Sequence, residues 1–405
     1  MSESTLSFEK FIQAPSSQVY RAFTNATALR EWMCDGATVV PRPGGRFYAW
    51  WNAGYYACGE YTKAQPDQAV AFTWHGRGQS VDTQVHITIA EKGGGALLKL
   101  AHSVQGTGSQ AEKARQDFRS EWPRSLENLA SVLESGQDLR FVRRPMLGIQ
   151  FNEFNPEIAK KLSVPVKEGI RLDDVIAGMG AAAAGLTKDD VLISMAGRPA
   201  HDFASLTAAL QGCQAGDTVE VVFYRGPEKK TVQMQLSGRP LPEIPDTPAE
   251  MARRAREIAE ADLSKLEQVL GSISEAEAAY KPAPEEWSVK EILAHLIHSE
   301  RGLQSLVTDM YAGYERVADD FGGNIDAAVI ATVSAYPTLA ELILEYKRSC
   351  AETNALIAAA PPEFVARQGS YTRLGYYCLD STGSHVLTHL AQIEAAVQAA
   401  REVKV

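Results

Sequence analysis

The segment Ser384-His385-Val386-Leu387-Thr388-His389-Leu390-Ala391-Gln392-Ile393 decides the fold of the last third of the chain. Residues four apart lie on one face of an α-helix, so His385 and His389 can direct two imidazoles at one metal ion. The apolar residues around them form the stripe by which such a helix packs into a bundle. Because a chain with eight histidines can contain such a pair by chance, a metal site requires a third ligand.

A second segment, Trp287-Ser288-Val289-Lys290-Glu291-Ile292-Leu293-Ala294-His295-Leu296, offers that ligand. Ser288 and Glu291 have the spacing of a capping box, which predicts that a helix begins there and carries His295 two turns further on. Single histidines on apolar faces are commonly core residues, whereas three of them on two helices of one helical region favour a metal site. His298, one turn later, is a competing ligand or a group that supports the ligands.

The two motifs together resemble the DinB-like (YfiT-type) metal-binding four-helix bundle, and the resemblance covers residues 246–405. It implies that His295, His385 and His389 bind a divalent metal, with zinc, nickel and iron not distinguished by imidazole ligands. Three histidines leave a coordination position open for water or substrate, as in catalytic sites. The resemblance also implies a thiol-dependent transferase that uses a low-molecular-weight thiol. The thiol-transfer members often carry an arginine after the last ligand, where this chain has Leu390, and this departure weakens that implication.

The same region carries the start signals of four long helices. They predict helices at about 247–270, from 288, from 338 and at about 382–402, with long connections near 313–337 and 361–381. A proline-rich linker at 239–245 precedes them. The fold predicted for this part is an all-α four-helix bundle with ligands projecting inward.

Length and composition predict a multidomain protein without a membrane span. The 405 residues suffice for two to four domains, and no apolar run approaches the roughly 18–20 residues that cross a bilayer. The polar first residues are no signal peptide. The five cysteines are odd in number, far apart and without a Cys-x2-Cys pair, which favours a cytoplasmic location and argues against a cysteine zinc site. The net charge is −10 and no basic patch stands out, so nucleic-acid binding is not expected.

Residues 1–137 read as a first α+β domain. A strand at 7–12, a helix at 16–23, a hairpin at 83–89 with 96–101 and a closing helix at about 110–135 follow from the patterns. The motifs Phe11-Ile12-x-Ala14-Pro15, Pro43-Gly44-Gly45-Arg46-Phe47 and Trp122-Pro123-x-Ser125-Leu126 resemble the START-like (SRPBCC) branch named after heat-shock chaperone ATPase activators. The resemblance implies a helix-grip fold: a curved antiparallel sheet wraps one long helix and encloses an apolar pocket.

Large aromatic residues are the candidates for lining that pocket, although each is also a candidate for the core. A small apolar ligand is the expected partner, because no paired carboxylates or nucleophile–base set stands out in this domain. The candidates are Trp32, Trp50, Trp51, Tyr56, Trp74, Phe118 and Trp122.

Residues 141–240 read as short strands around a helix that Asp202 caps. The segment resembles a PDZ domain of the bacterial, protease-associated kind, which implies a β-barrel-like fold and binding of a protein C-terminal peptide beside an edge strand. No Ser-His-Asp protease domain accompanies it, so a protease is not expected. The residues implied are Met146, Leu147, Gly148 and Ile149 in the carboxylate-binding loop, Gln150 and Phe151 in the strand, and Leu206 and Leu210 in the helix.

The chain ends Val403-Lys404-Val405, an apolar-x-apolar terminus of the kind that PDZ grooves accept. The chain's own C-terminus is therefore a candidate PDZ ligand, with a frayed helix end as the alternative. Taken together, the patterns predict a cytoplasmic multidomain binding or adaptor protein. The alternatives are a metal-dependent thiol transferase or hydrolase and, from the first domain alone, a chaperone regulator.

Overall fold

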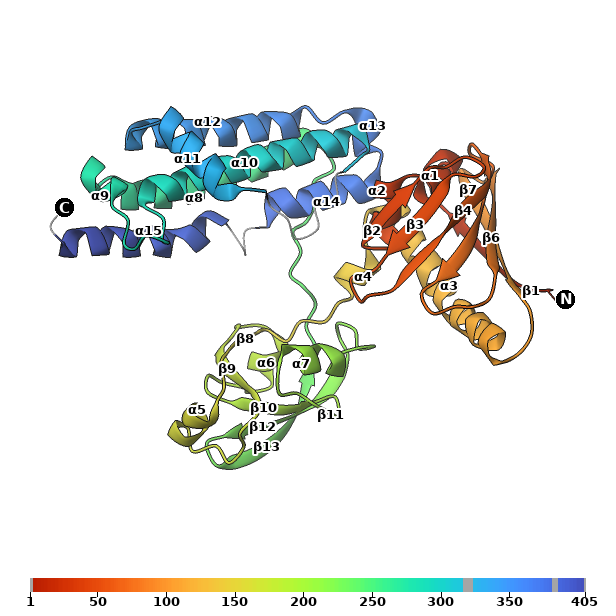
Figure 1. Ribbon diagram of the computed structural model, residues 1–405, viewed down its shortest axis with the longest axis horizontal. Coiled ribbons are helices and arrows are strands. Elements are labelled where there is room, and N and C mark those ends of the chain that lie inside the picture. The colour runs from red at the N-terminus through yellow and green to blue at the C-terminus, as the bar shows by residue number, and fades with distance from the viewer. Residues whose placement is uncertain (1–2, 316–322, 381–384, 404–405) are drawn as a thin grey trace. The chain divides into compact units, whose positions relative to one another are not determined.

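The computed structural model describes residues 3–315, 323–380 and 385–403 (Figure 1). The chain divides into two compact units, one made of Met1–Asp138 with Pro242–Val405 and the other of Leu139–Leu241. The middle segment is therefore inserted between two parts of a single unit. The multidomain α+β architecture expected from the sequence is confirmed.

The N-terminal domain wraps one antiparallel sheet around a long helix. In β6 every second residue from Thr83 to Ile89 is buried, so one face of the strand meets the core and the other meets solvent. The predicted hairpin is confirmed, because β6 and β7 pair from Thr83↔Val104 to Lys92↔Gly95. The strand order is β1-β7-β6-β5-β4-β3-β2. The elements are β1 Glu3–Ile12, α1 Ser16–Thr24, α2 Ala26–Trp32, β2 Gly36–Val39, β3 Arg46–Trp50, β4 Tyr56–Gln65, β5 Ala69–Gly76, β6 Thr83–Lys92, β7 Gly95–Gln105 and α3 Ser109–Ser135.

The middle domain is a twisted antiparallel sheet with short helices. Its strand order is β13-β12-β10-β9-β8, with β11 beside β10, and among the described residues β8 forms an open edge, so the sheet is barrel-like without closing. Asp202 caps α7 by accepting a hydrogen bond from the Ser205 N–H at 2.7 Å, as predicted. The elements are α4 Leu139–Val142, β8 Ile149–Asn152, α5 Pro156–Lys161, β9 Ile170–Val175, α6 Gly180–Ala183, β10 Val191–Met195, β11 Arg198–Pro199, α7 Phe203–Ala209, β12 Thr218–Arg225 and β13 Glu228–Gln235.

The C-terminal domain is a helical bundle. The predicted starts are correct, because the hydroxyls of Thr247, Ser288 and Thr338 each accept a backbone hydrogen bond at the first turn of a long helix. Helix α10 packs against α11, α12 and α15, and α8 packs against α12 and α15. The elements are α8 Pro248–Leu270, α9 Glu275–Ala279, α10 Val289–Ala312, α11 Ile325–Ala335, α12 Leu339–Ala358, α13 Pro362–Val365, α14 Gln368–Leu379 and α15 His385–Glu402.

Two segments predicted as long connections are partly helical. The segment 313–337 contains α11, and the segment 361–381 contains α13 and α14. Helix α11 has apolar residues on several faces and therefore lacks the one-sided period that marks an amphipathic helix. Helix α14 is fixed by packing between domains, since it contacts α2 and α3 as well as α8. Neither α11 nor α14 is marked by a local sequence pattern, so the prediction that these two segments are connections was wrong.

A buried ionic network joins α14 to the N-terminal domain. The Arg373 guanidinium lies 3.6 Å from the Glu31 carboxylate and also pairs with Glu315, and both carboxylates are buried. Glu315 lies 3.3 Å from Arg30 as well, and Ser370 Oγ donates a hydrogen bond to Glu31. The charges offset one another, which is the condition under which such groups can be buried.

No single helix in the described part of the chain has the length and apolar character needed to cross a bilayer. Only α11 and α12 taken together reach that threshold, and they meet at an angle of 114°.

Candidate metal centre and binding sites

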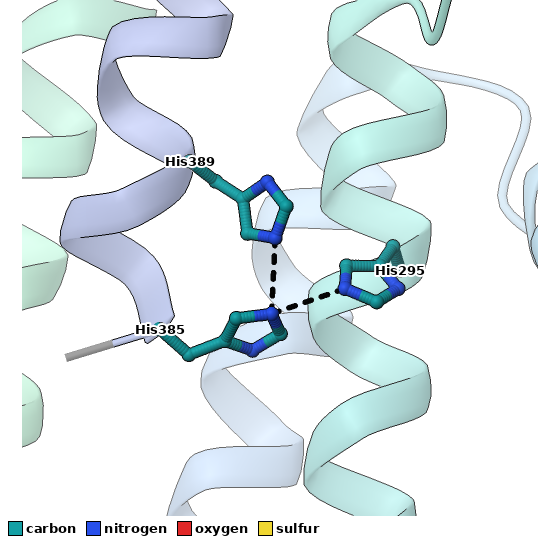
Figure 2. A group of neighbouring side chains, drawn as sticks. All are labelled: His295, His385 and His389. Atoms are coloured by element: carbon teal, nitrogen blue, oxygen red, sulfur yellow. Dashed lines mark hydrogen bonds between the residues drawn. The ribbon is translucent and has the colours of Figure 1, made fainter. Parts of the chain in front are cut away.

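Three histidine rings from two helices converge at one point of the bundle (Figure 2). Nε2 of His385 lies 3.1 Å from Nε2 of His295 and 3.0 Å from Nε2 of His389. Each of the three residues offers a ligand nitrogen within 4.8 Å of the other two. The residues that were predicted to meet, 90 positions apart in sequence, are therefore adjacent in space.

Local sequence explains how each ring is held. The capping box of Ser288 and Glu291 sets the start of α10, and the buried neighbours Ala294 and Leu296 fix the rotation of that helix around His295. The Trp287 ring packs against the His295 ring with a centroid distance of 4.9 Å. On α15, the buried side chains of Val386 and Ile393 hold the helix against the bundle, so the two histidines one turn apart face α10.

The electrostatics of the cluster favour neutral imidazoles. Burial, followed by the neighbouring histidines, lowers the pKa of His295 to about 4. Burial and His389 also lower the pKa of His385. Nδ1 of His389 lies 2.8 Å from Oε1 of Gln392, and because that oxygen only accepts, Nδ1 carries the proton and Nε2 presents a lone pair.

The residues present fit a divalent metal ion. Ligand nitrogens about 2.0–2.1 Å from a tetrahedral zinc ion lie roughly 3.3–3.4 Å apart. The separations of 3.0 Å, 3.1 Å and at most 4.8 Å in the cluster bracket this value. A neutral imidazole has one N–H, so three converging Nε2 atoms cannot all satisfy one another, whereas a shared cation accepts all three lone pairs. His298 contributes no atom to this cluster of described residues, and the donor set does not identify the metal.

A cavity of about 300 Å³ inside the bundle is lined by His385 and by polar side chains that the sequence did not single out. Among these are Glu300 on α10 and Thr353 and Asn354 on α12. Thr353 Oγ1 donates a hydrogen bond to Glu300 at 2.7 Å, and burial raises the pKa of Glu300. Glu300 follows His295 by five residues, but nothing in the local pattern shows that its half-buried side chain borders a cavity.

The N-terminal domain contains a separate cavity of about 400 Å³ between the sheet and α3. Four of the seven predicted lining residues border it: Trp51, Trp74, Phe118 and Trp122. A chain of hydrogen bonds connects Trp122 to the backbone of Trp74. Trp122 Nε1 donates to His102 Nδ1 at 2.9 Å, and His102 Nε2 lies 3.0 Å from Thr83 Oγ1. Thr83 in turn donates to the Trp74 carbonyl at 2.6 Å.

The other three predicted residues lie elsewhere, which corrects the expectation for them. Trp32 is a core residue whose Nε1 donates to the Ala22 carbonyl at 2.9 Å. In β3 the residues Phe47 and Ala49 point into the core, so the alternation of the strand turns Trp50 to the opposite face. Tyr56 is on that face too, where Tyr48 packs against both aromatic rings.

The predicted peptide-binding residues surround the open edge of β8. Gly148 has φ +73°, which favours glycine, and the carbonyls of Leu147 and Gly148 accept hydrogen bonds from Ala181 and Ile176. Met146 pairs with Ser237, and Ile149, Gln150 and Phe151 belong to β8 or its start. On α7 and its C-terminal cap, Leu206 and Leu210 belong to or pack against the core of the domain. Phe203, which was not predicted, stacks on Phe151 with a centroid distance of 5.8 Å and so connects α7 to the edge strand.

The folds and the cluster define a protein of three modules, one of which is a helical bundle with a candidate metal centre. Family models match each module in the expected order: "Activator of Hsp90 ATPase homolog 1-like protein" over residues 13–134, "PDZ domain" over 145–236 and "DinB superfamily" over 258–392. The chain is therefore a fusion of a START-like domain, a PDZ domain and a DinB-like domain.

Similar curated proteins and solved structures each match a part of the chain. A probable periplasmic serine protease do/HhoA-like of Haemophilus influenzae is 31% identical over 105 residues, which is 26% of this chain and 22% of the relative. The periplasmic pH-dependent serine endoprotease DegQ of Escherichia coli is 29% identical over 99 residues, 24% of this chain and 22% of the relative. This chain thus spans about a fifth of the length of either protease.

Among solved structures, protein MLL2253 from Mesorhizobium loti has 22% identity and a TM-score of 0.30, covering 32% of this chain and 97% of that chain. The Aha1 dimer from Colwellia psychrerythraea has 18% identity and a TM-score of 0.29, covering 32% of this chain and 96% of that chain.

Proposed function

We propose that this chain is a cytoplasmic, metal-dependent multidomain binding protein. The observation that carries the proposal is the convergence of the Nε2 atoms of His295, His385 and His389. These three imidazoles hold a divalent metal, and Gln392 orients one of them by accepting a hydrogen bond from Nδ1–H of His389. When bound, the metal supplies a Lewis-acidic centre with a coordination position for a small molecule.

The other two modules supply recognition. PDZ domains bind peptides, and the open edge of β8 lies beside an apolar loop and an aromatic pair, Phe151 with Phe203, which suit an apolar C-terminal residue. START-like domains bind hydrophobic ligands, and the cavity bordered by Trp51, Trp74 and Trp122 suits a small apolar molecule. The chain's own C-terminus stays a candidate peptide, although Lys404 and Val405 lie outside the described residues.

A second candidate function is a metal-dependent transferase or hydrolase with or without a small thiol. It is favoured by the cavity that His385 lines together with Glu300, a half-buried carboxyl group able to accept or hold a proton.

Elemental analysis of the purified full-length protein tests the metal site. We expect stoichiometric divalent metal in the parent and its loss in His295→Ala, His385→Ala and His389→Ala, while the neighbouring control His298→Ala retains it. Metal retained by all three ligand variants would overturn the proposal. Turnover of thiol conjugates or esters that disappears with the metal would favour the enzyme, and metal without turnover would favour the binding protein.

A further inference from the structure

The cavity inside the bundle is rich in hydrogen-bond acceptors. Three carboxylates border it, those of Asp262, Glu300 and Asp380, and among the described residues no lysine or arginine does. Two thiols, Cys350 and Cys378, also line it, and burial raises the pKa of each to about 12, so both stay neutral. Any charge in the cavity therefore comes from its carboxylates and is negative, with Asp262 already paired with Lys265 at 3.6 Å.

One acceptor in this cavity has no donor. Asn354 is only 7% exposed, its Nδ2 donates to the Cys350 carbonyl at 2.9 Å, and its Oδ1 is buried without a hydrogen-bond partner among the residues that the structure describes. A buried carbonyl oxygen left unpaired costs about 1–3 kcal/mol. Because Asn354 borders the cavity, a donor bound in the cavity is a partner that this oxygen can gain.

A relay of side chains fixes the carboxyl group of Glu300. Gln304 Nε2 donates to Thr353 Oγ1 at 3.3 Å, and Thr353 Oγ1 donates to Glu300 Oε2 at 2.7 Å. One hydroxyl bond is weak compensation for a half-buried carboxylate, and burial shifts Glu300 toward its neutral form. No basic side chain borders the cavity in the described ranges, so a cationic ligand would stabilise the charged form of Glu300.

We propose that this cavity binds a small molecule through a protonated amine, which donates hydrogen bonds to Glu300 and to Asn354 Oδ1. The rest of the molecule lies among the apolar side chains of Ile258, Leu303 and Val386 and reaches His385 at the rim. The volume of about 300 Å³ corresponds to roughly ten water molecules at about 30 Å³ each, which suits an arylalkyl amine. Tyr377, at 57% exposed, marks the side from which the ligand enters. The inference names a substrate class for the proposed metal site. It depends on the proposed function only for the contact between the ligand and His385.

Three probes of similar size and different charge test the proposal by calorimetry on the full-length protein at pH 7, both metal-loaded and metal-free. We expect 2-phenylethylamine to bind at least about tenfold more tightly than 2-phenylethanol, and 3-phenylpropionate not to bind. Glu300→Gln keeps the acceptor for Thr353 and removes the charge, so the preference for the amine should disappear. Glu352→Gln on the exposed side of α12 is the control with the same change in charge, and it should retain the preference.

A second variant keeps the test decisive if Glu300→Gln is unstable. Asn354→Leu removes the unpaired oxygen at similar volume and should weaken the amine several-fold, while its effect on the alcohol is smaller. Equal binding of amine and alcohol, no binding of the amine, or a preference that survives both variants would overturn the inference. The metal content of the same preparations separates the two proposals. Protein that prefers the amine but takes up no metal would overturn the metal site alone. Protein that takes up metal but shows no preference for the amine would overturn this inference alone.

Discussion

Nδ1 of His389 lies 2.8 Å from Oε1 of Gln392, one helical turn further along α15. The amide oxygen accepts a hydrogen bond from the ring N–H and thereby fixes both the tautomer and the rotation of an imidazole whose other nitrogen faces His295 and His385. The Gln392 side chain is thus a positioning group for the metal centre.

Gln392→Ala should lower metal affinity about 10–100-fold while the three histidines remain in place. The loss follows because the His389 ring becomes free to rotate and to change tautomer. Competition with a chromophoric chelator measures the affinity. Gln398→Ala removes another α15 amide, whose partner is Glu402, and should leave the affinity unchanged. Equal affinities in the two variants would contradict this role.

The metal-free protein should lose stability as the pH falls from about 6.5 toward 4. The pKa of His295 is lowered to about 4 in the folded state from 6.5, so below 6.5 the unfolded chain binds a proton that the folded chain does not. His295→Ala should therefore show a smaller decrease in Tm between pH 7 and 5 than the metal-free parent, as measured by calorimetry. The exposed His86→Ala should behave like the parent.

His102→Leu should destabilise the START-like domain. The Trp122 N–H loses its acceptor inside the core, which costs about 1–3 kcal/mol, and Thr83 loses a contact as well. Denaturant unfolding followed by tryptophan fluorescence measures the effect. His102→Gln provides an amide in place of the ring and should recover part of the loss. Because burial lowers the pKa of His102 to about 3, the parent is also more acid-sensitive below pH 6.5 than the leucine variant.

Arg373→Met should be much more damaging than Glu31→Gln. Removing the guanidinium leaves Glu31 and Glu315 buried with reduced compensation, which costs about 3–5 kcal/mol. Burial raises the pKa of Glu31, so a neutral amide is tolerated there and Arg373 keeps Glu315. Arg253→Met, at an exposed ion pair, should change stability far less. A melting curve of each variant tests the ranking, and comparable losses for Arg373 and Arg253 would contradict it.

Gly148→Ala should weaken binding of C-terminal peptides at least tenfold. An added Cβ would lie 2.3 Å from Cβ of Met179, so the loop before β8 has to shift. Fluorescence polarisation with a labelled peptide ending in the chain's own Val403-Lys404-Val405 measures the affinity. Gly197→Ala has nearly the same φ, +74° against +73°, and no neighbour near the added atom. It should reduce stability slightly and leave peptide binding intact.

Signals confined to one element were readable from the sequence. The Ser288 and Thr338 caps predicted helix starts correctly, because the side chain that stops the fraying of a helix lies next to it in sequence. The alternation in β6 predicted its hairpin for the same reason. The histidines were found because a spacing of four already places two rings on one face.

Features that depend on packing between distant segments were not readable. Trp50 and Phe47 lie three apart in β3 and so face opposite sides of the sheet. This spacing predicts which side chain faces the core only when the limits of the strand are known. The partial burial of Glu300 arises because Thr353 and Asn354 of another helix lie beside it at the same cavity. Helix α14 is fixed by contacts with α2 and α3, more than 200 residues earlier in the chain.

The split of one compact unit around the PDZ domain has a consequence for synthesis. Glu31 leaves the ribosome long before its partners Ser370 and Arg373, which follow it by 339 and 342 positions. At about 5–20 residues per second that delay is roughly 17–70 s. Throughout this interval the nascent START-like domain displays the surface of α2 that α14 later covers, and it is during translation that this surface is most open to chaperones and to neighbouring chains on the same messenger.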